Sequence, residues 1–231
     1  MSLHGGHSGK FCEHAEGELR HVLEAAVTAG YHTFGVSEHA PRSEERFLYV
    51  TEREKGYDIS RLHTEFETYA QEISHLSEEF ADRLVVLRGF EAEVIPTVGY
   101  RKKMLDIRHR FDFDYMVGAV HYVEETSIDS SKTDFETMLA RSGGLERVAI
   151  KYYETVTEMV EALRPEVVGH LDLIRRHAGL GAKLATPAIR KVAGVALEAV
   201  RAHGCILDLN TAGYRKGLGS PYPAPWLVRQ A

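Results

Sequence analysis

The chain has 231 residues and a net charge of −6, which argues against a general nucleic-acid binder because such a protein needs a basic face. Apolar residues make up 44% and charged residues 27%, as in globular proteins and unlike disordered or membrane-spanning ones. No apolar run reaches the ~18 residues that cross a bilayer, and no secretory leader is visible. The two cysteines, Cys12 and Cys205, suit a reducing compartment, so we expect a cytoplasmic protein that binds neither nucleic acid nor membrane.

The predicted elements alternate between short apolar strands and longer amphipathic helices. In chain order, the pattern predicts a short strand near Leu3, a helix over 15–29, a strand over 33–36, a helix over 58–80, and strands over 84–87 and 115–120. It then predicts a helix over 145–163, a strand over 167–171, a helix over 187–203, a strand over 205–209, and a helix that begins near Pro225. Such units indicate an α/β protein with a parallel sheet, either a barrel or an open doubly wound sheet. No linker divides the chain, so we expect one domain over 1–231.

Polar side chains lie at or just past the carboxyl ends of five predicted strands. They are His39, Glu91, His121, His170 and Asn210. In a barrel these strand ends converge on one face, where active sites are built. Five such placements favour the barrel over the open sheet.

Histidine is in excess, with 13 residues, and neutral imidazole is the commonest metal ligand among side chains. Each candidate has an ordinary alternative as a loop, core or surface residue. Near the start of the chain, Gly5 and Gly6 can bend the backbone and bring neighbouring histidines to one centre. Taken together, the set can hold two or three divalent cations, with one carboxylate bridging two of them. The candidate ligands are His4, His7, His14, His39, Glu91, His121 and His170.

Paired metals ~3.5–4 Å apart commonly hydrolyse phosphate esters. The sequence has no G-x-S-x-G elbow, no P-loop and no cysteine nucleophile, so a metal-activated water is the expected nucleophile. Glu91 and His39 are the candidate catalytic residues, with His39 a possible proton donor to the leaving group. Both cysteines are interpreted as packing residues. The candidate phosphate-binding residues, which could equally be surface charges, are Arg175, Arg176, Arg215 and Lys216.

The motifs resemble those of the polymerase-and-histidinol-phosphatase (PHP) superfamily, and most closely its monofunctional histidinol-phosphatases. The matching segments run in family order from residue 4 to about 223: HGGHSGKFCEHA, GVSEHAPR, GFEAEV, GAVHYV, VVGHLDLIRR and LNTAGYRKG. The resemblance implies a distorted (β/α)7 TIM-like barrel with a trinuclear site for Zn, Mn or Fe. It also implies hydrolysis of L-histidinol phosphate to L-histidinol and phosphate in histidine biosynthesis.

The resemblance also implies individual roles. His7 would bind the first metal, and Glu91 would bridge the first and second. His121 and His170 would complete the second site, and His14 and His39 would bind the third metal. Arg215, with Arg175 or Arg176, would bind the phosphate.

The sequence departs from the family pattern in two places. The usual His-x-His has Gly5 at its first position, so either His4 fills that role or the first metal lacks a ligand. The G-[SD]-D-[AS]-H motif that ends family members is absent. We therefore expect a barrel without its last strand and helix, lower stability, a tendency to oligomerise, and weak occupancy of the first and third metals.

Two alternatives to the histidinol-phosphatase prediction stay open. One is another PHP phosphoesterase that acts on a nucleotide or sugar phosphate, which a substrate panel would distinguish. The other is a metal-binding PHP-like domain with weak or no catalysis, which inactivity with Mn, Zn and Fe would favour.

Overall fold

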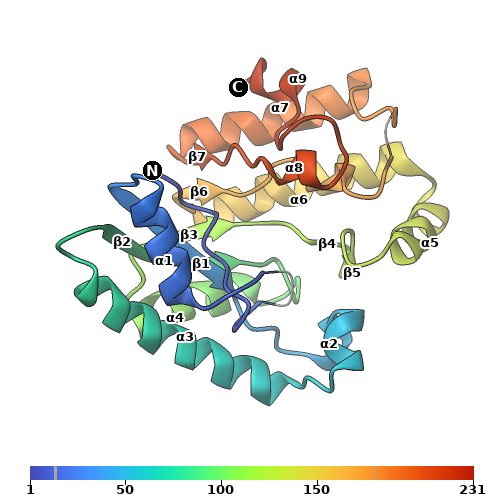
Figure 1. Cartoon of the computed structure of the whole chain (residues 1–231). Helices are drawn as coiled ribbons and strands as arrows, with labels where there is room; N and C mark the ends of the chain where they lie inside the picture. The colour runs from blue at the N-terminus through green and yellow to red at the C-terminus, as the bar shows by residue number, and fades with distance from the viewer. Residues whose placement is uncertain (13–14, 180) are drawn as a thin grey trace. The chain divides into compact units, whose positions relative to one another are not determined.

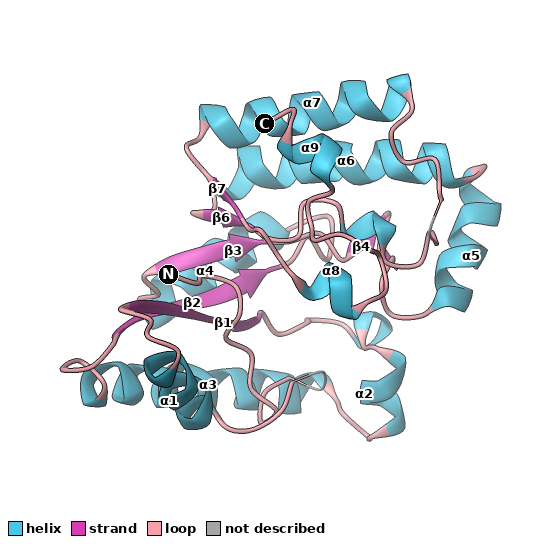
Figure 2. Cartoon of the chain, turned by 45° about the horizontal axis from the view of Figure 1, so that its top comes forward, coloured by secondary structure: helices cyan, strands magenta, loops and turns pink. Residues whose placement is uncertain are grey.

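The computed structural model describes residues 1–12, 15–179 and 181–231. The chain divides into two compact units. The first unit comprises Met1–Ala92 and Lys102–Val117, and the second comprises Glu93–Arg101 and Gly118–Ala231. Both combine parallel strands with helices (Figures 1 and 2), which confirms the predicted α/β class. Among the described residues, no helix combines the length and apolar character needed to cross a membrane.

The first unit is built on the parallel strands β1 (Thr33–His39) and β2 (Val85–Ala92), followed in sheet order by β3 (Tyr115–Gly118). Its helices are α1 (Leu19–Thr28), α2 (Val50–Glu54), α3 (Ile59–Glu79) and most of α4 (Tyr100–Phe111). Figure 2 shows α1 and α3 on one side of β1 and β2. The register pairs His39 with Glu91, so two predicted site residues lie side by side at the carboxyl ends of the two strands.

Helix α3 shows why the sequence folds in this way. Asp58 caps its first turn by accepting a hydrogen bond from the Arg61 backbone N–H at 2.7 Å. Its buried residues recur at helical spacing, and they are Phe66, Tyr69, Ile73 and Leu76. The Tyr69 hydroxyl lies 2.5 Å from the Gly89 carbonyl and 3.2 Å from the Val36 carbonyl, and so ties α3 to both strands. Burial raises the pKa of Tyr69 well above its usual value, which keeps the hydroxyl a donor.

A tyrosine on β3 positions the start of the chain. The Tyr115 ring lies over Gly35 and Gly89, where an added Cβ would come within 2.4 Å and 2.3 Å of ring or hydroxyl atoms. Its hydroxyl donates to the Leu3 carbonyl at 2.8 Å, and the Gly35 N–H donates to the Ser2 carbonyl at 2.7 Å. Residues 2 and 3 are therefore held beside β1, which fixes the position of the residue that follows them.

The second unit contains two parallel strands, β6 (Val167–Val168) and β7 (Ile206–Leu207), and an antiparallel pair, β4 (Tyr122–Val123) and β5 (Thr126–Ser127). Its long helices α6 (Leu145–Leu163) and α7 (Pro187–Ala202) pack against each other (Figure 1). Three shorter helices complete it: α5 (Lys132–Ser142), α8 (Ala212–Arg215) and α9 (Pro225–Val228).

The predicted long helices over 58–80, 145–163 and 187–203 are confirmed as α3, α6 and α7. The predicted strands over 33–36, 84–87, 115–120, 167–171 and 205–209 are present as β1, β2, β3, β6 and β7, although β6 and β7 have two residues each. Near the predicted first strand, Ser2 forms a single parallel bridge to Phe34. Strands β4 and β5 and helices α2, α4, α5 and α8 were not predicted. The prediction of one domain over 1–231, and that of a barrel without its last strand and helix, stay predictions.

Candidate functional site

A buried carboxylate lies at the centre of a histidine group in the first unit. Glu91 is only 1% exposed, and its Oε1 lies 3.2 Å from His4 Nε2. Its Oε2 lies 3.0 Å from His39 Nδ1 and 3.7 Å from His7 Nε2. An ionised carboxylate is rarely buried without compensating positive charge. This group therefore suits a site that holds a cation.

The local backbone explains why His4 and His7 both reach Glu91. Ser2 and Leu3 are fixed beside β1, and Gly6 packs so closely on β1 that an added Cβ would lie 2.9 Å from the Gly35 carbonyl oxygen. Neither Gly5 nor Gly6 has a positive φ. The chain bends at Leu3 and His4, and the lack of a side chain at Gly6 allows two backbones to approach closely. Ligand atoms of His4, His7 and Glu91 lie within 4.8 Å of one another, so His4 lies beside the two residues that are predicted to bind the first metal.

A second carboxylate in this unit orients His7. Glu38 Oε2 lies 3.3 Å from His7 Nδ1, and Glu38 Oε1 accepts hydrogen bonds from the Ser8 N–H at 2.7 Å and the Ser8 hydroxyl at 3.1 Å. A carboxylate only accepts hydrogen bonds, so this contact places the ring proton on Nδ1 and leaves Nε2 with a lone pair. That nitrogen is the one that faces Glu91.

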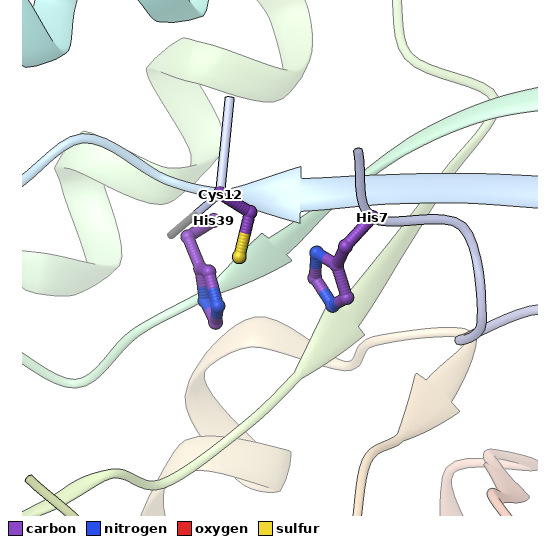
Figure 3. Close-up of side chains that lie close together, drawn as sticks. All are labelled: His7, Cys12 and His39. Carbon is purple, nitrogen blue, oxygen red and sulfur yellow. The ribbon is translucent and has the colours of Figure 1, made fainter. Parts of the chain in front are cut away.

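Cys12 belongs to the same region. Its sulfur lies near His7 and His39 (Figure 3), and the three residues offer ligand atoms within 4.8 Å of one another. The place of Cys12 beside two imidazoles was not predicted, because its sequence position favours a packing role. The predicted ligand His14 lies outside the described residues.

The second unit holds its own histidine pair. His121 follows β3 and His170 follows β6, and their ring centroids are 5.0 Å apart. Glu93 Oε2 lies 2.6 Å from His121 Nδ1, which again leaves Nε2 with a lone pair. His170 is buried and has a φ of 24°, a conformation that the surrounding contacts must hold. The predicted sharing of a cation between Glu91 and these two histidines stays a prediction.

The predicted phosphate-binding residues differ in their surroundings. Arg175 donates to Asp172 Oδ2 at 3.1 Å, to the Pro221 carbonyl at 2.8 Å and to the Ser220 hydroxyl at 2.5 Å. Asp172 also accepts from the Ala224 N–H at 2.8 Å. Burial raises the pKa of Asp172 to about 6, and Arg175 opposes that rise. These contacts give Arg175 a structural role, and its predicted contact with phosphate stays a prediction.

The other three basic residues are close enough to influence one another. Partial burial of the Lys216 side chain lowers the pKa of its ammonium group, and the charges of Arg176 and Arg215 lower that pKa further. Burial also raises the pKa of Tyr222 to about 12, and Arg176 is the largest opposing influence. The charges of Arg176 and Arg215 thus both act on Lys216, against an opposing influence of Asp129, and these three basic residues are called the basic group of the second unit. Asn210, by contrast, caps the turn before α8 by accepting from the Ala212 N–H at 2.9 Å.

Sequence reasoning missed three residues of these groups: Glu38, Glu93 and Cys12. A signal existed for the carboxylates, since Glu38 precedes His39 and Glu93 lies two residues after Glu91. Nothing in the spacing said which imidazole each carboxylate would face. Cys12 had a weaker signal, its place between candidate ligands in the segment HSGKFCEHA.

The residues present fit a divalent cation. Imidazole nitrogens and carboxylate oxygens from separate segments converge, and two imidazoles have carboxylate partners on the opposite ring nitrogen, the usual arrangement of metal-binding histidines. The donors suit Zn, Fe or Mn.

Comparison with known proteins agrees with this chemistry. The PHP domain family matches residues 4–212. A probable histidinol-phosphatase of Schizosaccharomyces pombe is 31% identical over 226 residues, which cover 96% of this chain and 73% of that protein. The crystal structure of a candidate histidinol phosphatase from Listeria monocytogenes superposes with a TM-score of 0.81 at 23% identity, covering 95% of this chain and 86% of that one.

A second solved structure shares the fold at lower similarity. It is the histidinol phosphate phosphatase of Lactococcus lactis, in complex with Zn, L-histidinol and phosphate, with a TM-score of 0.62 at 17% identity. The match covers 85% of this chain and 68% of that one. From the family match and the identity to the yeast relative, the chain belongs to the PHP domain family and, within it, to the histidinol-phosphatases.

Proposed function

We propose that the protein is a metal-dependent phosphomonoesterase that hydrolyses L-histidinol phosphate to L-histidinol and phosphate in the cytoplasm. The observation that carries the proposal is Glu91, a carboxylate 1% exposed that faces three imidazoles at 3.0–3.7 Å. The relatives support the choice of substrate, since the yeast protein is named a probable histidinol-phosphatase and the Lactococcus enzyme was crystallised with L-histidinol and phosphate.

In the first unit, a cation would be held by Glu91, His4, His7 and His39. In the second unit, a cation would be held by His121 and His170. We propose two or three ions in all. A divalent cation supplies a water acidic enough to attack near neutral pH, and positive charge against the phosphoryl oxygens. Glu38 and Glu93 keep a lone pair on the Nε2 atoms of His7 and His121, because each carboxylate holds the proton on the other ring nitrogen.

The basic group of the second unit is the proposed phosphate site. Support for this comes from Lys216, because the charges of both Arg176 and Arg215 lower the pKa of its ammonium group. A guanidinium can donate two parallel hydrogen bonds to a phosphate, so Arg215 is the proposed bidentate contact. The charges would also draw the dianionic ester toward the unit before it binds.

The leaving alkoxide needs a proton. His39 is the candidate donor within the first unit because its side chain is 23% exposed, against 3% for His4 and 15% for His7. Solvent water is the alternative source if a cation engages the His39 ring.

The proposal is tested with the full chain, stripped by a chelator and restored with Zn, Mn or Fe. Phosphate release is measured from L-histidinol phosphate, a nucleoside monophosphate and a hexose phosphate. We expect L-histidinol phosphate to have the highest kcat/KM and the chelated protein to be inactive. A preference for another ester, or no turnover with any metal, would contradict the proposal.

A substitution at the central carboxylate gives a second test. Glu91→Gln removes the charge that the three imidazoles share with a cation, so kcat should fall by at least about 100-fold. The matched control is Glu54→Gln on α2, an exposed glutamate whose loss should leave kcat unchanged. Near-normal turnover of Glu91→Gln would contradict the assignment of the Glu91 carboxylate to the catalytic site.

A further inference from the structure

The loop before α1 folds back so that Cys12 lies beside His7. The Ser8 carbonyl accepts hydrogen bonds from the Cys12 N–H at 2.9 Å and the Phe11 N–H at 3.1 Å, which closes a tight turn over residues 8–12. The same Ser8 is fixed at its other side, because its N–H and hydroxyl both donate to Glu38. The thiol is thus placed by backbone and scaffold contacts that need no ligand.

The Cys12 thiol lies among other side chains that can bind a metal. Cys12, His7 and His39 each offer one ligand atom, and these atoms lie within 4.8 Å of one another (Figure 3). In a tetrahedral zinc site with Zn–S of ~2.3 Å and Zn–N of ~2.0–2.1 Å, neighbouring ligand atoms lie ~3.4–3.6 Å apart. Small side-chain rotations would bring the three atoms to that spacing.

A cavity borders two of the three proposed ligands, Cys12 and His39. Cys12, His39 and Glu38 line a cavity of about 60 Å³, which also contacts Ala40 and Phe66. A water molecule takes ~30 Å³ of liquid volume, so the cavity accommodates an ion together with a water. Cys12 is 7% exposed, so competing reactions of the thiol with solvent species are restricted.

We propose that Cys12 coordinates, as a thiolate, the divalent cation held by His7 and His39, and that this sulfur makes the site select zinc over manganese. Coordination releases the Sγ proton to solvent. Thiolate is a soft ligand that favours Zn, whereas Mn prefers carboxylate, carbonyl and water oxygens. The proposal rests on the proposed metal-dependent function only in assuming that the chain binds a cation, and it leaves the substrate open. It also commits His39 to the cation, which favours water as the proton donor to the leaving group.

The test uses cobalt, because a cobalt–thiolate bond gives an intense near-ultraviolet charge-transfer band that imidazole and carboxylate ligands do not give. The metal-free full chain is titrated with Co²⁺. We expect the band in the unmodified chain and in Cys205→Ser, the matched control that removes the other cysteine. We expect no band in Cys12→Ser, whose metal-free form is compared with the unmodified chain by circular dichroism and thermal melting.

Three outcomes would overturn the proposal: cobalt uptake by the unmodified chain without the band, a band that persists in Cys12→Ser, or no cobalt uptake at all. The first and third outcomes are measured on the unmodified chain alone. The test therefore still applies if the Cys12→Ser variant fails to fold. Phosphatase activity is assayed separately. A band without turnover of L-histidinol phosphate keeps the thiolate ligand and rejects the proposed function, and turnover without a band does the reverse.

Selectivity gives a second readout that needs no activity. Loss of the sulfur should weaken zinc binding by roughly 10–100-fold or more and leave manganese binding within a few-fold. Equal losses for the two metals would contradict the proposal.

Discussion

Each unit contains a carboxylate that contacts Nδ1 of a histidine and thereby orients its ring. In the first unit, Glu38 faces His7 at 3.3 Å and also accepts two hydrogen bonds from Ser8. In the second, Glu93 faces His121 at 2.6 Å, and its side chain is 13% exposed against 2% for Glu38. Glu38 therefore orients an imidazole and satisfies buried hydrogen-bond donors of Ser8. Glu93 Oε1 also accepts hydrogen bonds, from the Val94 N–H at 2.8 Å and the His121 N–H at 3.4 Å, but these are only part-buried, whereas the Ser8 bonds are buried. The comparison teaches that two carboxylates can orient an imidazole in the same way and yet differ in how much they contribute to stability.

The largest expected effect tests the scaffold role in the second unit. Asp172→Ala removes the acceptor of Arg175 and of the Ala224 N–H and leaves a largely buried guanidinium without its counter-charge. Breaking such a pair costs about 3–5 kcal/mol of the free energy of unfolding. Denaturant unfolding measures it. Ser220→Ala, which removes one neutral partner of Arg175, should cost only about 1 kcal/mol. Equal losses for the two variants would contradict the assignment.

The next effect tests the double role of Glu38. Glu38→Ala leaves the buried Ser8 N–H and hydroxyl without their acceptor and should cost about 2–3 kcal/mol of unfolding free energy, because an unsatisfied buried donor is costly. Glu93→Ala in parallel should cost less, about 1 kcal/mol, because the Val94 and His121 N–H groups that it releases are only part-buried and can bond to water. If Glu93→Ala destabilises the chain as much as Glu38→Ala, the contrast between the two units is lost.

A third change separates orientation from stability. Glu93→Gln offers His121 an amide N–H in place of a carboxylate oxygen, which favours the ring proton on Nε2 and blocks that nitrogen as a ligand. We expect zinc affinity of the second unit to fall by roughly 10–100-fold, with thermal stability of the metal-free chain unchanged. Calorimetric titration and thermal melting give the two values. Unchanged zinc affinity would show that His121 does not bind metal through Nε2.

The smallest effect concerns the support of His4. Tyr115→Phe removes one hydrogen bond, from the hydroxyl to the Leu3 carbonyl, and keeps the ring over Gly35 and Gly89. Unfolding free energy should fall by about 1 kcal/mol. Zinc binding at the first unit should weaken a few-fold, and the affinity of the second unit should not change. A change confined to the second unit would reject this role for the hydroxyl.

The sequence predicted those parts of the fold that carry a strong apolar pattern. Helices α3, α6 and α7 have wide buried faces, and their bounds agree with the prediction within one or two residues. Helix α4 was missed because its sequence YRKKMLDIRHRF buries only Met104, too little to show a periodic face. The strand-end rule correctly brought His39 and Glu91 to the same edge, since each lies at the carboxyl end of an apolar run that forms a strand of one parallel sheet.

The partners of the ligands could not be predicted in the same way. The side-chain hydrogen bonds of Glu38 determine which of its oxygens faces His7. The turn that the Ser8 carbonyl closes determines how the chain brings Cys12 back beside His7. Contacts between side chains 30 residues apart leave no periodic trace in a single sequence. Arg175 has structural contacts that the sequence does not predict, because its hydrogen bonds join the 3-10 turn Leu173–Arg175 to residues 220 and 221. Its contact with phosphate stays a prediction.

The bare backbone at Gly35 and Gly89 has a consequence for inherited variation. A methyl group at either position would displace the Tyr115 ring, withdraw its hydroxyl from Leu3 and loosen the segment that leads into His4. Neither glycine is among the predicted metal ligands. Alleles altered there should nonetheless lose activity as a metal-free enzyme does, and should also unfold at a lower temperature. A survey that searches for damage only near the reacting atoms would misread them.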